Sequence, residues 1–219
     1  MTVDNTNDRG DWIETYTGGR FYPKDPQAAD INILDIAHAL SLTCRFGGHC
    51  SRFYSIAEHS VYCAFKLLEI DPLRWNKRFF LLSALLHDAS EAYLLDIPRP
   101  IKKMMPEYKK WEKHLQSVIN TKFKLDKEHC IYPEYYSQFL ENIKFVDELM
   151  LFSEAKSFNM NRNDDWVFNV KTTDKIHIIP LMPEDAERLF LNVYDAILTD
   201  SGVEKLYSQL KYYSCRDLK

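Results

Sequence analysis

The sequence is poor in glycine and has no long apolar run. Only six of its 219 residues are glycine, and the apolar residues recur mostly at helical spacing, without an internal repeat or a low-complexity tract. No apolar stretch is long enough to span a bilayer, and the polar, acidic start MTVDNTNDRGDW lacks the apolar core of a signal peptide. We therefore expect a cytoplasmic protein that makes no contact with a membrane.

The cysteines are odd in number and widely spaced. There are five, and no two of them form a C-x-x-C pair, which argues against a disulfide framework and against a thiolate zinc site. We expect reduced thiols that serve as small core or surface residues. They are Cys44, Cys50, Cys63, Cys130 and Cys215.

Strong charge of either sign is also absent. The net charge is −4, which gives no general reason to expect binding to nucleic acid or to an anionic membrane. Hydrophobic residues make up 46% and charged residues 27%, as in an ordinary globular protein. The length suits one core, or one core with a small extension. A small anionic substrate held by local positive charge remains open.

The spacing of apolar residues predicts an all-α fold. We expect an irregular N-terminal arm over residues 1–29, a helical core over 30–160, and a C-terminal extension over 161–219 that packs on the core. An irregular insertion near 160–181 contains WVFNV and IHII, which suit short strands or an extended loop. The predicted helices cover residues 31–44, 55–70, 77–94, 106–124, 133–159 and 183–198.

Several of these helices have recognisable ends. Ser55 and Glu58 form the Ser-x-x-Glu pattern of a capping box. Asp71-Pro72 is a typical start for the third helix, and Pro98 prevents that helix from continuing past its end. Gly202 is expected to cap the last helix.

The third predicted helix carries charge in an apolar setting. The stretch LLHDASEAYLL places His87, Asp88 and Glu91 among leucines and alanines, and buried charges are costly unless they are paired or bound to a metal. His59 and Asp147 lie on two other apolar helices. Each could be an ordinary core histidine or surface aspartate. Together, two imidazoles and two carboxylates could bind a divalent ion between helices, for which Zn²⁺, Co²⁺ and Mn²⁺ are suitable.

These residues resemble the H…HD…D signature of the HD-domain phosphohydrolases. The segments AEHS, LLHDASEAYLLDIPRPIK and VDELML resemble the branch that holds bacterial 5′-deoxynucleotidases and phage enzymes that remove triphosphate from dATP. The block DINILDIAHALSLTCRFGGHCSRFYSIAEHS is most similar to the phage enzymes. The resemblance covers about residues 15–160 and implies an HD-domain helical bundle in the cytoplasm of a bacterial or phage-infected cell.

The resemblance also assigns roles to residues. It implies a divalent ion, with additional Mg²⁺ as an option, and Glu91 as the catalytic carboxylate. It implies substrate-binding residues both before and after the HD motif. Lys102 stands where the family has a lysine that contacts phosphate, but Lys103 follows directly, so the position is ambiguous by one residue. The implied metal ligands are His59, His87, Asp88 and Asp147, and the implied substrate-binding residues are Arg45, Phe46, Asp96, Pro100 and Lys102.

The expected reaction is the hydrolysis of dATP to deoxyadenosine and triphosphate. The alternative within the same resemblance is a 5′-deoxynucleotidase that releases phosphate from deoxynucleoside monophosphates. A non-catalytic domain that senses a nucleotide or a metal is a second alternative, and a purely structural helical protein is a third. The expected partner is a deoxynucleotide, and relatives in this branch imply a homo-oligomer, either a dimer or a hexamer.

Overall fold

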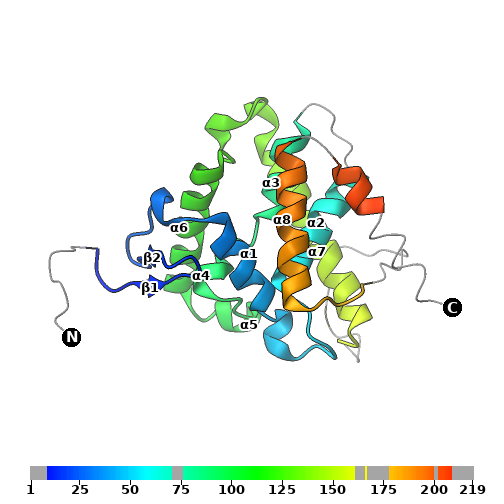
Figure 1. The fold of residues 1–219 in the computed structure, drawn as a ribbon, viewed down its shortest axis with the longest axis horizontal. Coiled ribbons are helices and arrows are strands. Elements are labelled where there is room, and N and C mark those ends of the chain that lie inside the picture. The colour runs from blue at the N-terminus through cyan, green and yellow to red at the C-terminus, as the bar shows by residue number, and fades with distance from the viewer. Residues whose placement is uncertain (1–8, 71–75, 161–165, 167–177, 200–201, 209–219) are drawn as a thin grey trace.

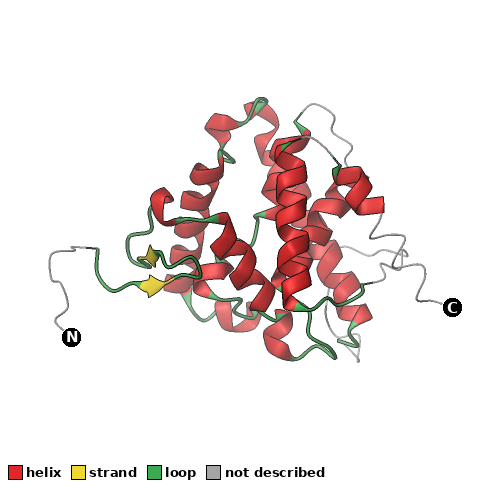
Figure 2. Ribbon diagram, in the orientation of Figure 1, coloured by secondary structure: helices red, strands yellow, loops and turns green. Residues whose placement is uncertain are grey.

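The protein folds mainly into α-helices, as the sequence predicts (Figure 2). The computed structural model describes residues 9–70, 76–160, 166, 178–199 and 202–208. Within these ranges no helix is both long enough and apolar enough to cross a lipid bilayer. The α-helices are α1 Ile33–Leu42, α2 Ile56–Ile70, α3 Lys77–Leu85, α4 Glu91–Leu94, α5 Arg99–Lys102, α6 Pro106–Phe123, α7 Tyr136–Ser157 and α8 Pro183–Leu198.

Helix α2 lies at the centre of the helical core. It contacts α1, α3, α7 and α8, and α8 in turn packs across α1 and α3 (Figure 1). Ile36 of α1, Val61 of α2 and Phe190 of α8 are all fully buried. Helix α8 therefore shares one hydrophobic core with helices that precede it by more than a hundred residues.

The start of α2 is fixed by the capping box that the sequence predicts. The Glu58 carboxylate accepts hydrogen bonds from the Ser55 backbone N–H at 2.9 Å and from its hydroxyl at 2.7 Å, and the Glu58 N–H donates to Ser55 Oγ at 3.2 Å. Glu58 also accepts from the Leu181 N–H at 2.8 Å, just before α8. One buried side chain thus caps α2 and attaches the approach to α8.

The N-terminal arm is more ordered than we expected. It contains a two-stranded antiparallel hairpin, β1 Ile13–Glu14 and β2 Arg20–Phe21, followed by a short 3-10 helix, η1 Ala28–Asp30. Gly18 has a φ of +80°, which glycine adopts easily and which closes the turn. Asp35 of α1 accepts from the Thr17 N–H at 2.7 Å and holds the hairpin on the core.

The third predicted helix is interrupted, contrary to our expectation. We predicted one helix through residue 94, but α3 ends at Leu85 and α4 begins at Glu91. The Nδ1 of His87 lies 2.8 Å from the carbonyl oxygen of Ala84, which the N–H of Asp88 would need in a continuous helix. The Asp71-Pro72 start signal lies outside the described residues.

The remaining helix limits agree with the sequence to within a few residues. Short 3-10 turns precede α7 at Lys127–His129 (η3) and Pro133–Tyr135 (η4), and a fourth, Arg45–Gly48 (η2), follows α1. Helix α8 has the predicted bounds, but its cap is Thr199 and not Gly202. Of the segments WVFNV and IHII, the structure describes only Trp166, Ile178 and Ile179, so the prediction for these segments lies mostly outside the described residues.

Candidate metal centre

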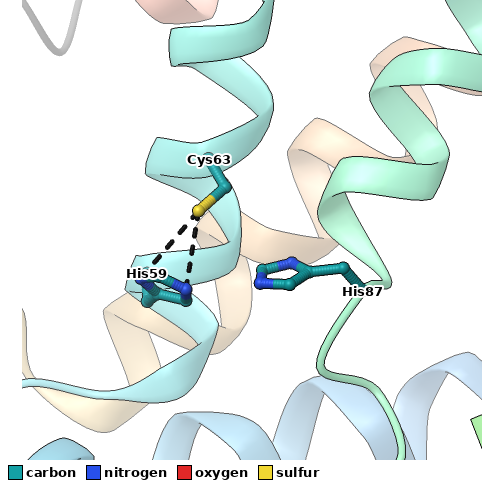
Figure 3. Close-up of side chains that lie close together, drawn as sticks. All are labelled: His59, Cys63 and His87. Atoms are coloured by element: carbon teal, nitrogen blue, oxygen red, sulfur yellow. Dashed lines mark hydrogen bonds between the residues drawn. The ribbon is translucent and has the colours of Figure 1, made fainter. Parts of the chain in front are cut away.

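The four predicted metal ligands converge from three parts of the chain. His59 lies in the first turn of α2, His87 and Asp88 lie in the turn between α3 and α4, and Asp147 lies in the middle of α7. Figure 3 shows the ring of His87 reaching from this turn toward the ring of His59. The break in α3 is what turns the His-Asp pair away from a helical path and toward α2 and α7.

The facing atoms of these side chains are spaced as metal donors are. His59 Nε2 lies 3.2 Å from Asp147 Oδ1 and 3.7 Å from Asp88 Oδ2. His87 Nε2 lies 3.3 Å from Asp88 Oδ2 and 3.9 Å from Asp147 Oδ1. Coordination bonds of about 2.0–2.2 Å would place adjacent donors roughly 3.0–3.5 Å apart. Two of these four distances lie in that range and two are slightly longer, so these atoms form a candidate position for a divalent ion.

Both imidazoles are held with Nε2 facing this position. The Nδ1 of His59 lies 2.6 Å from Glu154 Oε1, and the Nδ1 of His87 lies 2.8 Å from the Ala84 carbonyl oxygen. These acceptors place the proton on Nδ1 and leave the Nε2 lone pair for an ion, which is the usual arrangement at metal sites. The buried Nε2 of His87 has no hydrogen-bond partner among the described residues.

The electrostatics of the cluster favour a cation. Burial lowers the pKa of His87, but Asp88 and Asp147 outweigh it and raise that pKa to about 10. Burial would raise the pKa of Asp147, yet the two histidines hold it well below its ordinary value. Protons on the histidines thus supply the positive charge that the two carboxylates require when no ion is bound.

Cys63 lies beside this cluster, but its sulfur does not face the candidate ion position. It sits one turn after His59 on α2, and its Sγ is 3.5 Å from Nε2 and 3.9 Å from Nδ1 of that ring (Figure 3). A sulfur almost equally far from both nitrogens lies beside the ring and away from the direction of the Nε2 lone pair. We therefore assign the candidate ion position to the two histidines and two aspartates.

Glu91 lies next to the cluster, in the first turn of α4. It is buried, and its Oε2 has no hydrogen-bond partner among the described residues, while Oε1 lies 3.4 Å from Lys102 Nζ. Burial raises the pKa of Glu91 well above its ordinary value, Asp88 and Asp96 raise it further, and Lys102 opposes them. The half-buried Asp96 therefore acts on the same site through its charge.

Arg45 joins the cluster from the loop after α1. Its Nη1 lies 3.6 Å from Asp88 Oδ2. Phe46 follows with a φ of +58°, an uncommon conformation for a residue other than glycine. Its ring faces Trp166, with centroids 6.5 Å apart and an angle of 29° between the planes. Pro100 is exposed in α5, and the structure records no contact between it and the ion position.

Three residues of this site carry no signal in the sequence. Glu154, two turns after Asp147 on α7, is fully buried and bonds to His59, Arg45 and Tyr54. Burial would raise the pKa of Glu154, but Arg45 and His59 outweigh it and keep this pKa below its ordinary value. The second residue is Tyr54, whose hydroxyl donates to Glu154. The third is Glu112 of α6, which accepts a hydrogen bond from Lys102. No motif marks these residues, because their role depends on how helices meet.

Comparison with known proteins finds relatives in bacteria. No protein-family model matches the chain. It is 33% identical over 120 residues to an uncharacterized protein of Rhodobacter capsulatus, covering 52% of this chain and 59% of that protein. It is 34% identical over 186 residues to the uncharacterized protein YfdR of Escherichia coli K12, covering 84% of this chain and 94% of YfdR. The chain therefore belongs to the same protein family as YfdR.

Proposed function

We propose that this protein is a metal-dependent phosphohydrolase of the HD-domain type that acts on a deoxynucleotide. The observation that carries the proposal is the convergence of His59, His87, Asp88 and Asp147, with both Nε2 atoms turned toward two carboxylates. A bound divalent ion at this position would supply a water nucleophile and stabilise charge on a phosphoryl group. The proposed ion is Zn²⁺, Co²⁺ or Mn²⁺, since imidazole and carboxylate donors suit all three.

Glu91 is the proposed acid–base residue. Its unpartnered Oε2 and its raised pKa suit a carboxyl group that exchanges a proton with a reacting group. In the forward reaction it would accept a proton from the attacking water and deliver one to the 5′ oxygen of the leaving nucleoside. Lys102, 3.4 Å from Oε1, would keep the carboxylate oriented and contact phosphate.

Arg45 and Phe46 form the proposed substrate side of the site. Arg45 lies against Asp88, so its guanidinium can reach an oxyanion held at the ion position. The neighbouring Phe46 and Trp166 rings offer a stacking surface for a nucleobase. The proposed substrate is dATP, with deoxyadenosine and triphosphate as products.

A 5′-deoxynucleotidase is the second candidate, and the charge balance favours it in one respect. Arg45 and Lys102 are each paired with carboxylates, Arg45 with Glu154 and Lys102 with Glu112. A triphosphate carries more negative charge than a monophosphate and needs more free cations. Further basic residues, such as Lys103 beside Lys102, would have to supply them.

The test separates these reactions by their products. Purified protein is incubated with each deoxynucleoside triphosphate and monophosphate, with Co²⁺, Zn²⁺, Mn²⁺ or Mg²⁺ in turn. Nucleoside together with intact triphosphate, chiefly from dATP, would support the first reaction. Orthophosphate from monophosphates alone would support the second. Nucleotide binding without turnover under any metal would contradict both and favour a sensing domain.

A further inference from the structure

The buried carboxylate of Glu154 contacts two parts of the candidate site at once. Its Oε1 accepts from Tyr54 Oη at 2.9 Å and lies 2.6 Å from His59 Nδ1. Its Oε2 accepts from Arg45 Nε at 3.1 Å. The two oxygens are thus divided, one toward a proposed metal ligand and one toward the proposed oxyanion-binding arginine.

The residues that Glu154 contacts lie on separate elements, and its hydrogen bonds connect these elements. Glu154 is on α7, His59 is on α2, and Arg45 begins η2 after α1. Because Glu154 is seven residues after Asp147, it lies on the same face of α7, two turns along. One helix face therefore supplies a proposed ligand and also the support for another ligand.

The use of Arg45 Nε has a geometric consequence. A guanidinium has five N–H donors, and binding through Nε fixes its plane while leaving the two terminal nitrogens to reach other groups. Nη1 of Arg45 lies 3.6 Å from Asp88 Oδ2, on the side of the ion position. The orientation of this group therefore depends on the same carboxylate that sets the tautomer of His59.

We propose that Glu154 is a positioning residue that couples ion binding at His59 to oxyanion binding at Arg45. This inference rests on the proposed function. An ion on His59 orders the imidazole, its Glu154 partner and, through Oε2, the guanidinium of Arg45. A phosphate on Arg45 acts in the reverse direction, since coupling between two binding sites is reciprocal. Each ligand therefore raises the affinity for the other.

Glu58 provides a matched control within the same region. It is as fully buried as Glu154 and directly precedes His59 in α2. Its carboxylate bonds to Ser55 and to the Leu181 N–H, and no recorded hydrogen bond joins it to a predicted ligand. A Glu→Gln change at Glu58 removes a buried charge without touching the proposed coupling, so it separates a loss of fold stability from a loss of coupling.

The experiment measures binding without turnover. In a Glu91→Gln parent, Mn²⁺ and deoxyadenosine monophosphate are titrated by calorimetry, each alone and in the presence of the other. We expect Glu154→Gln to weaken Mn²⁺ binding about 10- to 100-fold, the usual cost of losing the group that supports a metal ligand. We also expect the mutual enhancement between Mn²⁺ and nucleotide to disappear. Tyr54→Phe, which removes one of the three bonds, should act in the same direction with a smaller effect.

The outcomes separate the coupling from the proposed function. Glu58→Gln should lower the thermal unfolding midpoint and leave Mn²⁺ affinity and the enhancement unchanged. If Glu154→Gln and Tyr54→Phe behave like Glu58→Gln, the coupling is refuted while the ion site stands. If the parent binds no Mn²⁺, or His59→Gln leaves Mn²⁺ binding intact, both the ion site and the coupling are refuted.

Discussion

At the scale of single residues, the site depends on which atoms lack a partner inside the protein. Among the described residues, five buried side-chain atoms have no hydrogen bond, and two of them, His87 Nε2 and Glu91 Oε2, belong to the candidate site. Leaving a buried polar group unpaired costs about 1–3 kcal/mol. His87 Nε2 also lies 3.3 Å from the Asp88 carboxylate, so its surroundings suit a proton or a metal ion. The two atoms belong to a proposed metal ligand and to the proposed acid–base residue.

Glu91→Gln tests the second of these assignments. We expect turnover to fall about 10²- to 10⁴-fold, because the amide cannot exchange the proton that a carboxyl group transfers. Metal content and the thermal unfolding midpoint should change little, since the amide has nearly the same size and shape. Steady-state kinetics with the best substrate and metal analysis of the purified variant provide the measurement.

Glu112→Gln is the control for that change. It alters the other carboxylate that bonds to Lys102 and leaves Glu91 in place. Turnover should then stay within about tenfold of the unaltered protein, because only the orientation of a lysine changes. Equal losses in the two variants would contradict a specific proton-transfer role for Glu91.

Trp166→Ala tests the proposed contact with the base. Stacking of a base on an aromatic side chain contributes about 1–3 kcal/mol, so we expect KM to rise roughly 5- to 150-fold with a smaller change in kcat. The control is Trp12→Ala. Trp12 is another half-exposed tryptophan, it directly precedes β1, and its ring contacts Arg20 of β2, so this change should leave KM unaltered. Equal KM values for the unaltered protein and Trp166→Ala would show that the base binds elsewhere.

At the scale of secondary-structure elements, the sequence predicts most helices and misses one break. The capping box locates the start of α2, because this signal acts within one turn of helix, and α6 and α8 begin at the predicted residues, each with a proline in the first turn. The interruption after Leu85 is different. It depends on a bond from the His87 ring to the Ala84 carbonyl, in a stretch of leucine and alanine that favours helix.

In the candidate site, too, residues with a local sequence signal can be predicted, whereas residues that act through contacts between helices cannot. His59, the His87-Asp88 pair and Asp147 are recognisable because polar residues stand out in apolar helices and match a known motif. Glu154 is polar and equally buried, yet its role becomes visible only once α7 lies beside α2 and the loop at Arg45. Contacts between elements distant in sequence leave no periodic pattern from which they could be predicted.

Glu58→Ala tests how far one residue stabilises the junction of two elements. Its carboxylate satisfies the N–H groups of Ser55 at the start of α2 and of Leu181 before α8. Losing these acceptors in a buried place should lower the free energy of unfolding by about 2 kcal/mol or more. Urea unfolding followed by circular dichroism measures this.

The comparison for Glu58 is another acid of the same helix. Glu69→Ala removes a partly exposed ion pair with Lys66, and such pairs contribute about 0.2–1 kcal/mol. The two variants should therefore differ clearly in their unfolding midpoints. Similar midpoints would mean that the attachment of the segment before α8 contributes little to stability.

At the scale of the whole molecule, the candidate ion position lies where the core helices meet. Helix α2 carries one proposed ligand in its buried first turn, and its neighbours α3 and α7 lead to the other proposed ligands. Placing one buried and three partly buried polar groups where helices meet weakens a core unless they neutralise one another or bind an ion. The stability of the entire fold should therefore respond to metal and to pH.

The raised pKa of His87 sets the direction of this response. In the metal-free protein this pKa is about 10, above the ordinary value near 6.5 in an unfolded chain. When a group has a higher pKa in the folded protein than in the unfolded chain, its proton stabilises the fold. This contribution is complete at pH values below the unfolded pKa and is lost as the pH rises to the folded pKa. Metal-free protein should therefore unfold at progressively lower temperatures between about pH 7 and pH 10.

Bound metal should remove most of that dependence, because histidine ligands are neutral and the ion replaces their protons. Thermal unfolding of chelator-treated protein, with and without Mn²⁺ at several pH values between 7 and 9, measures both effects. In the metal-free state, His87→Gln should flatten the slope, whereas a change at the exposed His114 should leave it unaltered. A metal-free midpoint that falls equally with pH in the unaltered protein and in His87→Gln would mean that the protons are held elsewhere. The two aspartates would then be balanced by another group, first of all His59, whose pKa is also raised well above its ordinary value.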